Sequence, residues 1–133
     1  MSVVDASAIA ELLLGMPLAP AAEPHVFETE EGVAAPDLLN AEILHVLRRY
    51  ERRGIIDAQR SREAVADLSD LPITRYPTMA LLERAWALRQ NLTAYDAMYV
   101  ALSEALGAHL VTTDGRLAAA ARAHARIAVV LLS

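Results

Sequence analysis

Two acidic residues stand directly after short apolar runs, where a carboxylate can do chemistry. Asp5 follows Ser2–Val4, and Asp114 follows His109–Thr113. In open α/β sheets, functional groups gather just past the carboxyl ends of the strands. Both carboxylates are therefore expected at one edge of a sheet if their strands are parallel. Each Asp also suits the alternative role of a helix N-cap, because it stands between a strand and a helix.

A third carboxylate, Glu42, falls within the apolar stripe of a predicted helix. A helical wheel places it among Leu38, Leu39, Ile43, Val46, Leu47 and Tyr50. A carboxylate that faces protein needs a cation, a metal ion or a proton. An ion pair with Arg49 or Arg53 is the alternative to metal binding, although Arg49 stands two turns away, about 10 Å along the helix axis.

The fourth acid, Asp96, comes three residues after Thr93, and this spacing resembles a capping box at the start of a helix. The alanines that follow suit a helix packed tightly on a sheet, which would bring Asp96 near the strand edge. Four carboxylates in one crevice repel one another unless cations neutralise them. Mg²⁺ and Mn²⁺ prefer oxygen ligands and keep waters that can attack a phosphodiester. The pattern predicts a metal-dependent phosphoryl-transfer site.

Short apolar strands alternate with helices along the chain, and these elements must position the acids. Strands are predicted over Ser2–Val4, Val33–Ala35, Ile73–Tyr76, His109–Thr113 and Ile127–Leu132. Helices are predicted over Ala6–Leu14, about Ala21–Glu30, Asp37 (as N-cap) to about Arg53, Asp57–Leu68, Pro77 to about Gln90, Ala94–Leu106 and Arg116–Ala125. This order predicts an α/β fold in one domain, residues 1–133, with a mainly parallel central sheet and helices on both faces.

The composition excludes several classes of site. The chain has no cysteine, so disulfides, thiolate zinc sites and a cysteine nucleophile are excluded. All 12 basic residues are arginine, which excludes a P-loop lysine and Schiff-base chemistry. A net charge of -5 argues against coating nucleic acid through bulk charge. We find no signal peptide or membrane span, and a cytoplasmic location is expected.

Four ordered segments resemble the PIN-domain family, and most of all its VapC branch, the toxin ribonucleases of bacterial toxin–antitoxin pairs. These segments are Val3–Ser7, Pro36–Glu42, Leu92–Leu102 and Leu110–Leu117. Each segment is weakly specific alone, but the ordered set at these separations is specific. The resemblance implies a PIN-like fold over nearly the whole chain.

The same resemblance implies roles for individual residues. Asp5, Glu42, Asp96 and Asp114 match the acidic quartet that holds Mg²⁺ or Mn²⁺ and activates water for RNA hydrolysis. Ser7 and Thr112 match hydroxyl positions that support the site. Some relatives carry a further acid shortly after the residue matching Asp114. Leu117 and Ala118 stand there in this chain, which leaves open whether Asp114 binds metal directly or through water.

The family also implies partners. Its members are usually homodimers that assemble with a VapB-type antitoxin, whose tail lies across the active-site groove, and their substrates are structured RNAs such as tRNA and rRNA loops. An acidic protein still needs cations for RNA phosphates. The candidates are Arg49 and Arg53, with Arg48 and Arg52 beside them, and Arg116 next to Asp114. A solvated face or an antitoxin contact is the alternative for these arginines.

Other functions fit parts of the sequence. A non-catalytic PIN-fold module that binds protein would share the fold without cleaving RNA. A Mg²⁺-dependent phosphate-binding switch domain would share the acids, but such domains rely on a lysine that this chain lacks. The spacing of Glu42 and His45 matches half of a di-iron site, yet it occurs once, so His45 is interpreted as a surface histidine.

Overall fold

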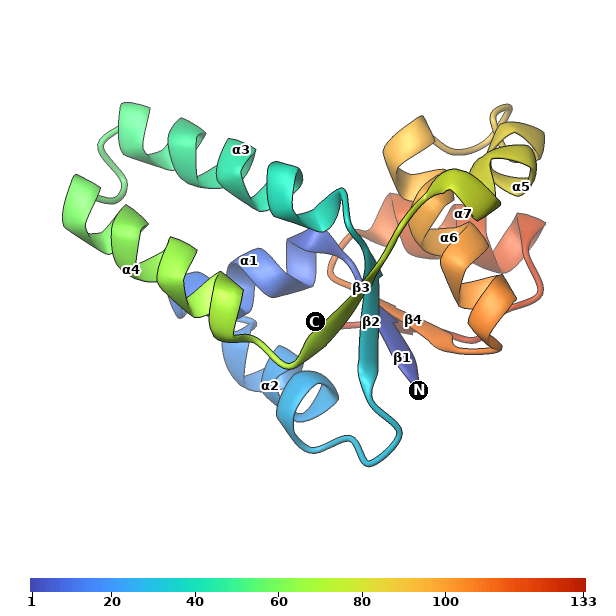
Figure 1. Cartoon of the computed structure of the whole chain (residues 1–133), viewed down its shortest axis with the longest axis horizontal. Helices are drawn as coiled ribbons and strands as arrows, with labels where there is room; N and C mark the ends of the chain where they lie inside the picture. Colours follow the sequence, from blue (N-terminus) through green and yellow to red (C-terminus); the bar gives the residue numbers. More distant parts are fainter.

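Five strands form one sheet in the computed structural model, which describes residues 1–133 (Figure 1). The strands are β1 (Ser2–Val4), β2 (Val33–Pro36), β3 (Ile73–Tyr76), β4 (His109–Thr112) and β5 (Val129–Leu131). Their order across the sheet is β3-β2-β1-β4-β5, and every neighbouring pair is parallel. The predicted parallel sheet is confirmed.

Seven α-helices cover the sheet in two groups, one on each side of the strands (Figure 1). The first group is α1 (Ala6–Leu14), α2 (Ala19–Phe27), α3 (Leu39–Arg52) and α4 (Ala58–Asp70), and the second is α5 (Leu82–Ala87), α6 (Ala94–Leu106) and α7 (Gly115–His124). Helices on both faces are what the βαβ connections of a parallel sheet require.

The order of the strands brings two chain segments together at the centre of the sheet. The chain moves outward from β1 to β3, then crosses back so that β4 pairs with the other side of β1, with Val4 opposite Val111. This reversal is a topological switch point, where open α/β sheets form a crevice at the carboxyl ends of the strands. The residues that follow β1 and β4 therefore lie at the same crevice.

Small side chains let α6 approach the sheet closely. Ala97 and Ala101 are buried in α6, which packs on β1, β2 and β4. Val3 and Val111 are fully buried in the central strands beneath the helices. Close packing of this kind holds the first turn of α6, and the acid it carries, at the strand edge.

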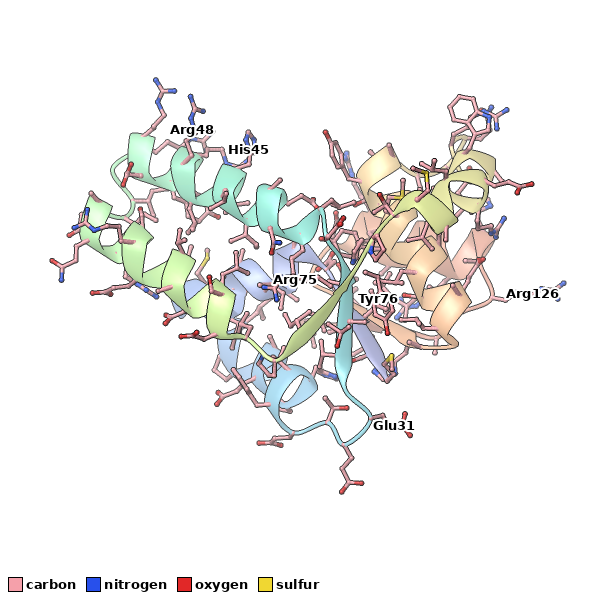
Figure 2. All side chains as sticks on the ribbon, in the orientation of Figure 1. Glu31, His45, Arg48, Arg75, Tyr76 and Arg126 are labelled. Carbon is pink, nitrogen blue, oxygen red and sulfur yellow. The ribbon has the colours of Figure 1, made fainter.

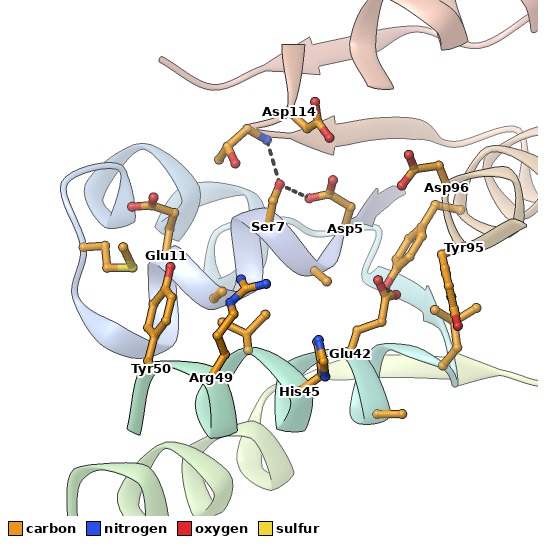
Figure 3. Close-up of a pocket in the computed structure, with 18 residues that line it drawn as sticks. Asp5, Ser7, Glu11, Glu42, His45, Arg49, Tyr50, Tyr95, Asp96 and Asp114 are labelled. Atoms are coloured by element: carbon orange, nitrogen blue, oxygen red, sulfur yellow. Dashed lines mark hydrogen bonds between the residues drawn. The ribbon is translucent and has the colours of Figure 1, made fainter. Parts of the chain in front are cut away.

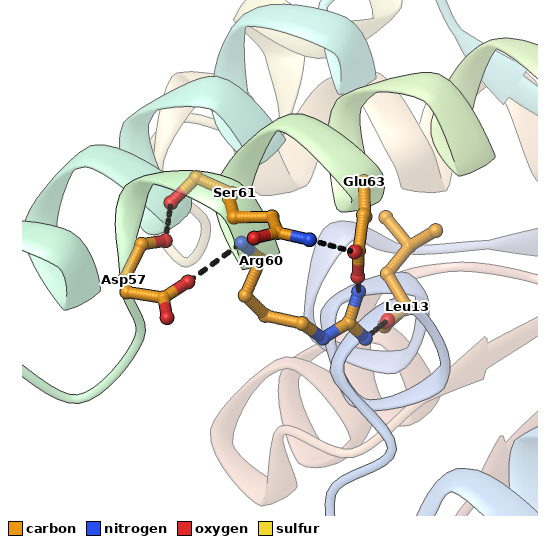
Figure 4. A network of polar contacts seen from close by, with 6 residues as sticks. Leu13, Asp57, Arg60, Ser61 and Glu63 are labelled. Carbon is orange, nitrogen blue, oxygen red and sulfur yellow. Dashed lines mark hydrogen bonds and ion pairs between the residues drawn. The ribbon is translucent and has the colours of Figure 1, made fainter.

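Polar contacts fix α4 against α1 (Figure 4). Asp57 caps α4 by accepting a hydrogen bond from the backbone N–H of Arg60 at 2.8 Å. The guanidinium of Arg60 donates to the carbonyl oxygen of Leu13 near the end of α1, and Glu63 lies 3.8 Å from the same guanidinium. These contacts satisfy a carbonyl that the end of α1 leaves without a helical partner.

The structure corrects two details of the predicted elements. Asp37 is not the N-cap of α3, which begins at Leu39 without a side-chain cap. The backbone N–H of Asp37 instead donates a hydrogen bond to the carbonyl of Tyr76 at 2.8 Å. Asp37 therefore extends the pairing of β2 with β3. The helix predicted from Pro77 to Gln90 is instead a 3₁₀ turn, η1 (Met79–Leu81), followed by the short α5. Backbone hydrogen bonds to the third preceding residue tighten the chain at the start and at the end of this segment.

None of the helices combines the length and apolar character needed to cross a membrane.

Candidate active site

All four predicted acids line one pocket of about 720 Å³ (Figure 3). Asp5 follows β1, Asp114 follows β4, Glu42 lies in the first turn of α3, and Asp96 lies in the first turn of α6. The switch point of the sheet therefore brings together residues that are more than one hundred positions apart in the chain. Residues of α3 and of the segments that follow β1 and β4 are among those that line the pocket.

Asp5 is the most buried of these acids, with 5% of its surface exposed. Its Oδ1 accepts hydrogen bonds from the hydroxyl of Ser7 at 2.7 Å and from the backbone N–H of Ala8 at 3.1 Å. Its Oδ2 accepts one from the hydroxyl of Thr112 at 2.5 Å. Three donors thus fix the orientation of the carboxylate, and the predicted cap of α1 is part of that arrangement.

The two hydroxyls that hold Asp5 also hold the loop after β4. The backbone N–H of Thr113 donates to Ser7 Oγ at 3.1 Å, and that of Asp114 donates to Thr112 Oγ1 at 2.9 Å. Figure 3 shows the Ser7 hydroxyl between the Asp5 carboxylate and this loop. The hydroxyls therefore set the position of Asp114 relative to Asp5.

Glu42 is bound by a tyrosine and not by an arginine. The phenol of Tyr99, on α6, donates a hydrogen bond to Glu42 Oε1 at 2.8 Å. None of the ion pairs in the structure involves any of the four acids, so the alternative of a pair with Arg49 or Arg53 is wrong. Tyr99 was not predicted from the sequence, although it follows Asp96 by three residues and so shares its helix face.

Helix capping accounts for part of the role of the remaining acids. Thr93 Oγ1 accepts a hydrogen bond from the backbone N–H of Asp96 at 3.2 Å, as the capping-box spacing predicts. Asp114 Oδ1 caps α7 by accepting from the backbone N–H groups of Arg116 and Leu117. Asp114 is therefore both an N-cap and a pocket residue.

Burial and mutual repulsion disfavour the charged forms of three acids. Burial raises the pKa of Asp5, against the opposing effect of its hydrogen bonds, and the charge of Asp96 raises it further. Burial also raises the pKa of Glu42, against the hydrogen bond from Tyr99. The pKa of Asp96 is raised by burial and then by Asp114. A cation in the pocket would relieve all three effects.

A sequence profile of the PIN domain matches residues 2–123 of the chain. The chain belongs to the PIN-domain family. Over 130 residues it is 42% identical to VapC ribonuclease Mb0985 of Mycobacterium bovis, and the match covers 98% of each chain. The predicted membership of the family, and of its VapC branch, is confirmed.

Solved structures agree with this PIN fold. VapC20 of Mycobacterium tuberculosis, described as a sarcin–ricin loop cleaving toxin, is similar with a TM-score of 0.69 and 20% identity, covering 90% of this chain and 95% of that one. A toxin–antitoxin complex from Klebsiella pneumoniae is similar with a TM-score of 0.60 and 21% identity, covering 86% and 87%. At these identities the likeness shows the fold alone.

The carboxylates in the pocket of this PIN domain are the kind of ligand that a hard divalent cation binds. Carboxylate oxygens are the ligands that Mg²⁺ prefers, and Mg²⁺ is usually held by one or two carboxylates together with several waters. No three His, Asp or Glu side chains converge closely enough to bind one ion directly. The pocket therefore suits cations held by one or two acids and water, and not a closed protein cage.

Basic and aromatic side chains also line the pocket. Arg49, His45 and Tyr50 do so from α3, and Figure 3 shows Arg49 and His45 rising from this helix, with Tyr95 on the other side of Glu42, near Asp96. His45 is exposed, as predicted, and with Arg48 it projects from α3 (Figure 2). Neither Tyr50 nor Tyr95 was predicted to border the site, although Tyr50 shares a helical stripe with Glu42 and Tyr95 directly precedes Asp96.

Only one of the five candidate phosphate-binding arginines lines the pocket. Arg49 does so, and its guanidinium lies 5.8 Å from the centroid of the Tyr50 ring. Arg53 and Arg116 are exposed and lie outside the pocket lining. Their roles stay predictions for a larger surface around the site.

Proposed function

We propose that this PIN domain is a VapC-type endoribonuclease toxin that cleaves structured RNA, such as a tRNA or rRNA loop, with Mg²⁺ as cofactor and Mn²⁺ as a substitute. The observation that carries the proposal is the meeting of four carboxylates in one pocket without a protein cation paired to any of them. The 42% identical relative named a ribonuclease supports the same activity.

The proposed mechanism assigns each acid a task. Asp5, Glu42, Asp96 and Asp114 would hold the divalent cations. When bound, these supply an activated water and offset charge on the attacking and leaving oxygens of the phosphodiester. Ser7 and Thr112 keep Asp5 and the loop of Asp114 in fixed positions, so little reorganisation is needed during the reaction.

RNA and antitoxin would meet the same pocket. Arg49 is the arginine that lines the pocket with the acids and is proposed to contact a substrate phosphate, with Arg53 and Arg116 contacting RNA or antitoxin outside the pocket. A VapB-type antitoxin would inhibit by covering this groove. The similar toxin–antitoxin complex from Klebsiella pneumoniae supports such a partner, and we propose a homodimer that joins a larger complex in the cytoplasm.

Metal dependence and one acid substitution test the mechanism. Purified protein should cleave RNA with Mg²⁺ or Mn²⁺ and stop in EDTA, and Asp96→Asn should abolish cleavage while circular dichroism stays unchanged. Asp70→Asn, an exposed residue at the end of α4, is the matched control and should cleave normally. Cleavage that survives both EDTA and Asp96→Asn overturns the mechanism. Antitoxin binding without cleavage under any metal would instead support the non-catalytic module.

A further inference from the structure

Tyr99 places a buried hydroxyl directly against an acid of the pocket. The side chain is 1% exposed, and its phenol donates to Glu42 Oε1 at 2.8 Å, which joins α6 to α3 across 57 positions of the chain. No other hydrogen bond reaches the phenol oxygen or the Glu42 carboxylate. A buried tyrosine hydroxyl requires a partner, and here that partner is Glu42 alone.

The hydroxyl is not needed to fill the core. A phenylalanine ring would occupy nearly the same volume among the apolar residues beneath α6, and the flanking Val100, Ala101 and Leu102 are all buried apolar residues. What the hydroxyl adds is one donor aimed at one carboxylate oxygen. Glu42 is a long side chain at a half-buried position, and without that donor it would sample several rotamers.

We propose that Tyr99 is a positioning residue for the metal site of the proposed function: it holds Glu42 with Oε1 occupied and Oε2 left for a divalent cation. Asp96 and Tyr99 lie on one face of α6, so this helix supplies both an acid of the pocket and the group that orients another. Residues that orient metal ligands by hydrogen bonding commonly change metal affinity by about 10-fold or more when they are removed.

Mn²⁺ binding measured by isothermal titration calorimetry tests this role without relying on cleavage. Tyr99→Phe should raise the Kd for Mn²⁺ by about 10-fold while far-ultraviolet circular dichroism stays unchanged. Tyr76→Phe is the matched control, because Tyr76 is partly buried on β3, outside the pocket lining, and it should leave the Kd unchanged. Glu42→Gln keeps an oxygen that can accept from Tyr99 but removes the charge.

The double variant Tyr99→Phe with Glu42→Gln separates positioning from general damage. If Tyr99 acts through Glu42, Tyr99→Phe should have little further effect on the Kd in the Glu42→Gln background. An equal loss in both backgrounds, or an unchanged Kd for Tyr99→Phe alone, overturns the inference and leaves the proposed function standing. A wild-type protein that binds no Mn²⁺ overturns the proposed metal site and this inference together.

Discussion

The hydroxyl of Thr112 donates to Asp5 Oδ2 at 2.5 Å and so joins the end of β4 to the acid after β1, across 107 positions of the chain. Thr112 Oγ1 in turn accepts a hydrogen bond from the backbone N–H of Asp114 at 2.9 Å. Thr112 is fully buried, so neither bond is exchanged with bulk water. One side chain therefore sets the relative position of two of the four acids.

Removing this hydroxyl should weaken both the fold and the metal site. Thr112→Val keeps the shape of the side chain but takes a donor from a buried carboxylate and an acceptor from a backbone N–H. We expect a loss of about 2 kcal/mol in the free energy of unfolding, measured by urea denaturation in EDTA, and a higher Kd for Mn²⁺. Thr74→Val, at an exposed position of β3, is the matched control and should change stability by less than about 0.5 kcal/mol. Equal stability of wild type and Thr112→Val would contradict the assignment.

Neutralising Asp96 should stabilise the metal-free protein increasingly as the pH rises. Burial and the charge of Asp114 raise the pKa of Asp96 above 3.8, so the folded state keeps this proton to higher pH than the unfolded state. The contribution of Asp96 to the free energy of unfolding therefore falls as the pH rises from the unfolded pKa through the raised folded pKa. In EDTA, the Tm of Asp96→Asn should therefore exceed that of wild type. The difference in Tm should grow as the pH rises from 4 and should reach roughly 2–4 °C at pH 7.

Adding Mg²⁺ should reverse that order at neutral pH. The cation binds the folded state and relieves carboxylate repulsion, so the Tm of wild type should rise with Mg²⁺ concentration. Asp96→Asn should respond less, because it has lost one acid of the site. Differential scanning calorimetry with and without Mg²⁺ gives both values, and Asp70→Asn controls for the loss of one charge. A margin that is constant with pH, or equal Mg²⁺ responses, would argue against a coupled acidic cluster.

Arg49 should contribute to RNA binding without contributing to metal binding. In the non-cleaving Asp96→Asn background, Arg49→Gln should weaken binding of a labelled RNA and lower the slope of log K against log salt by about 1, the change expected for one lost phosphate contact. Fluorescence anisotropy at several KCl concentrations measures this slope. Arg62→Gln, exposed on α4, carries the same change in charge and should leave the slope nearly unaltered. Identical slopes for the two variants would remove Arg49 from the substrate surface.

Local signals were enough to predict the framework of this protein. The apolar runs that end at Asp5 and Asp114 and the capping residue Thr93 act within a few positions of the chain, so strands, helix starts and the acids at strand ends could be read directly. Asp37 was mispredicted because its backbone pairs with β3, which is distant in the chain. The segment after Pro77 was mispredicted because short-range hydrogen bonds tighten it into a 3₁₀ turn.

The sequence by itself determined that Asp5 and Asp114 could meet, because parallel strands present their carboxyl ends at one edge, and its helical patterns indicated Glu42 and Asp96 as further members of the site. Only the tertiary structure decided what holds those acids. Tyr99 reaches Glu42 because α6 and α3 pack on either side of the pocket, and Thr112 reaches Asp5 because β4 returns beside β1. Such pairings depend on how elements distant in the chain are brought together. Helical or strand periodicity in the sequence does not specify that geometry.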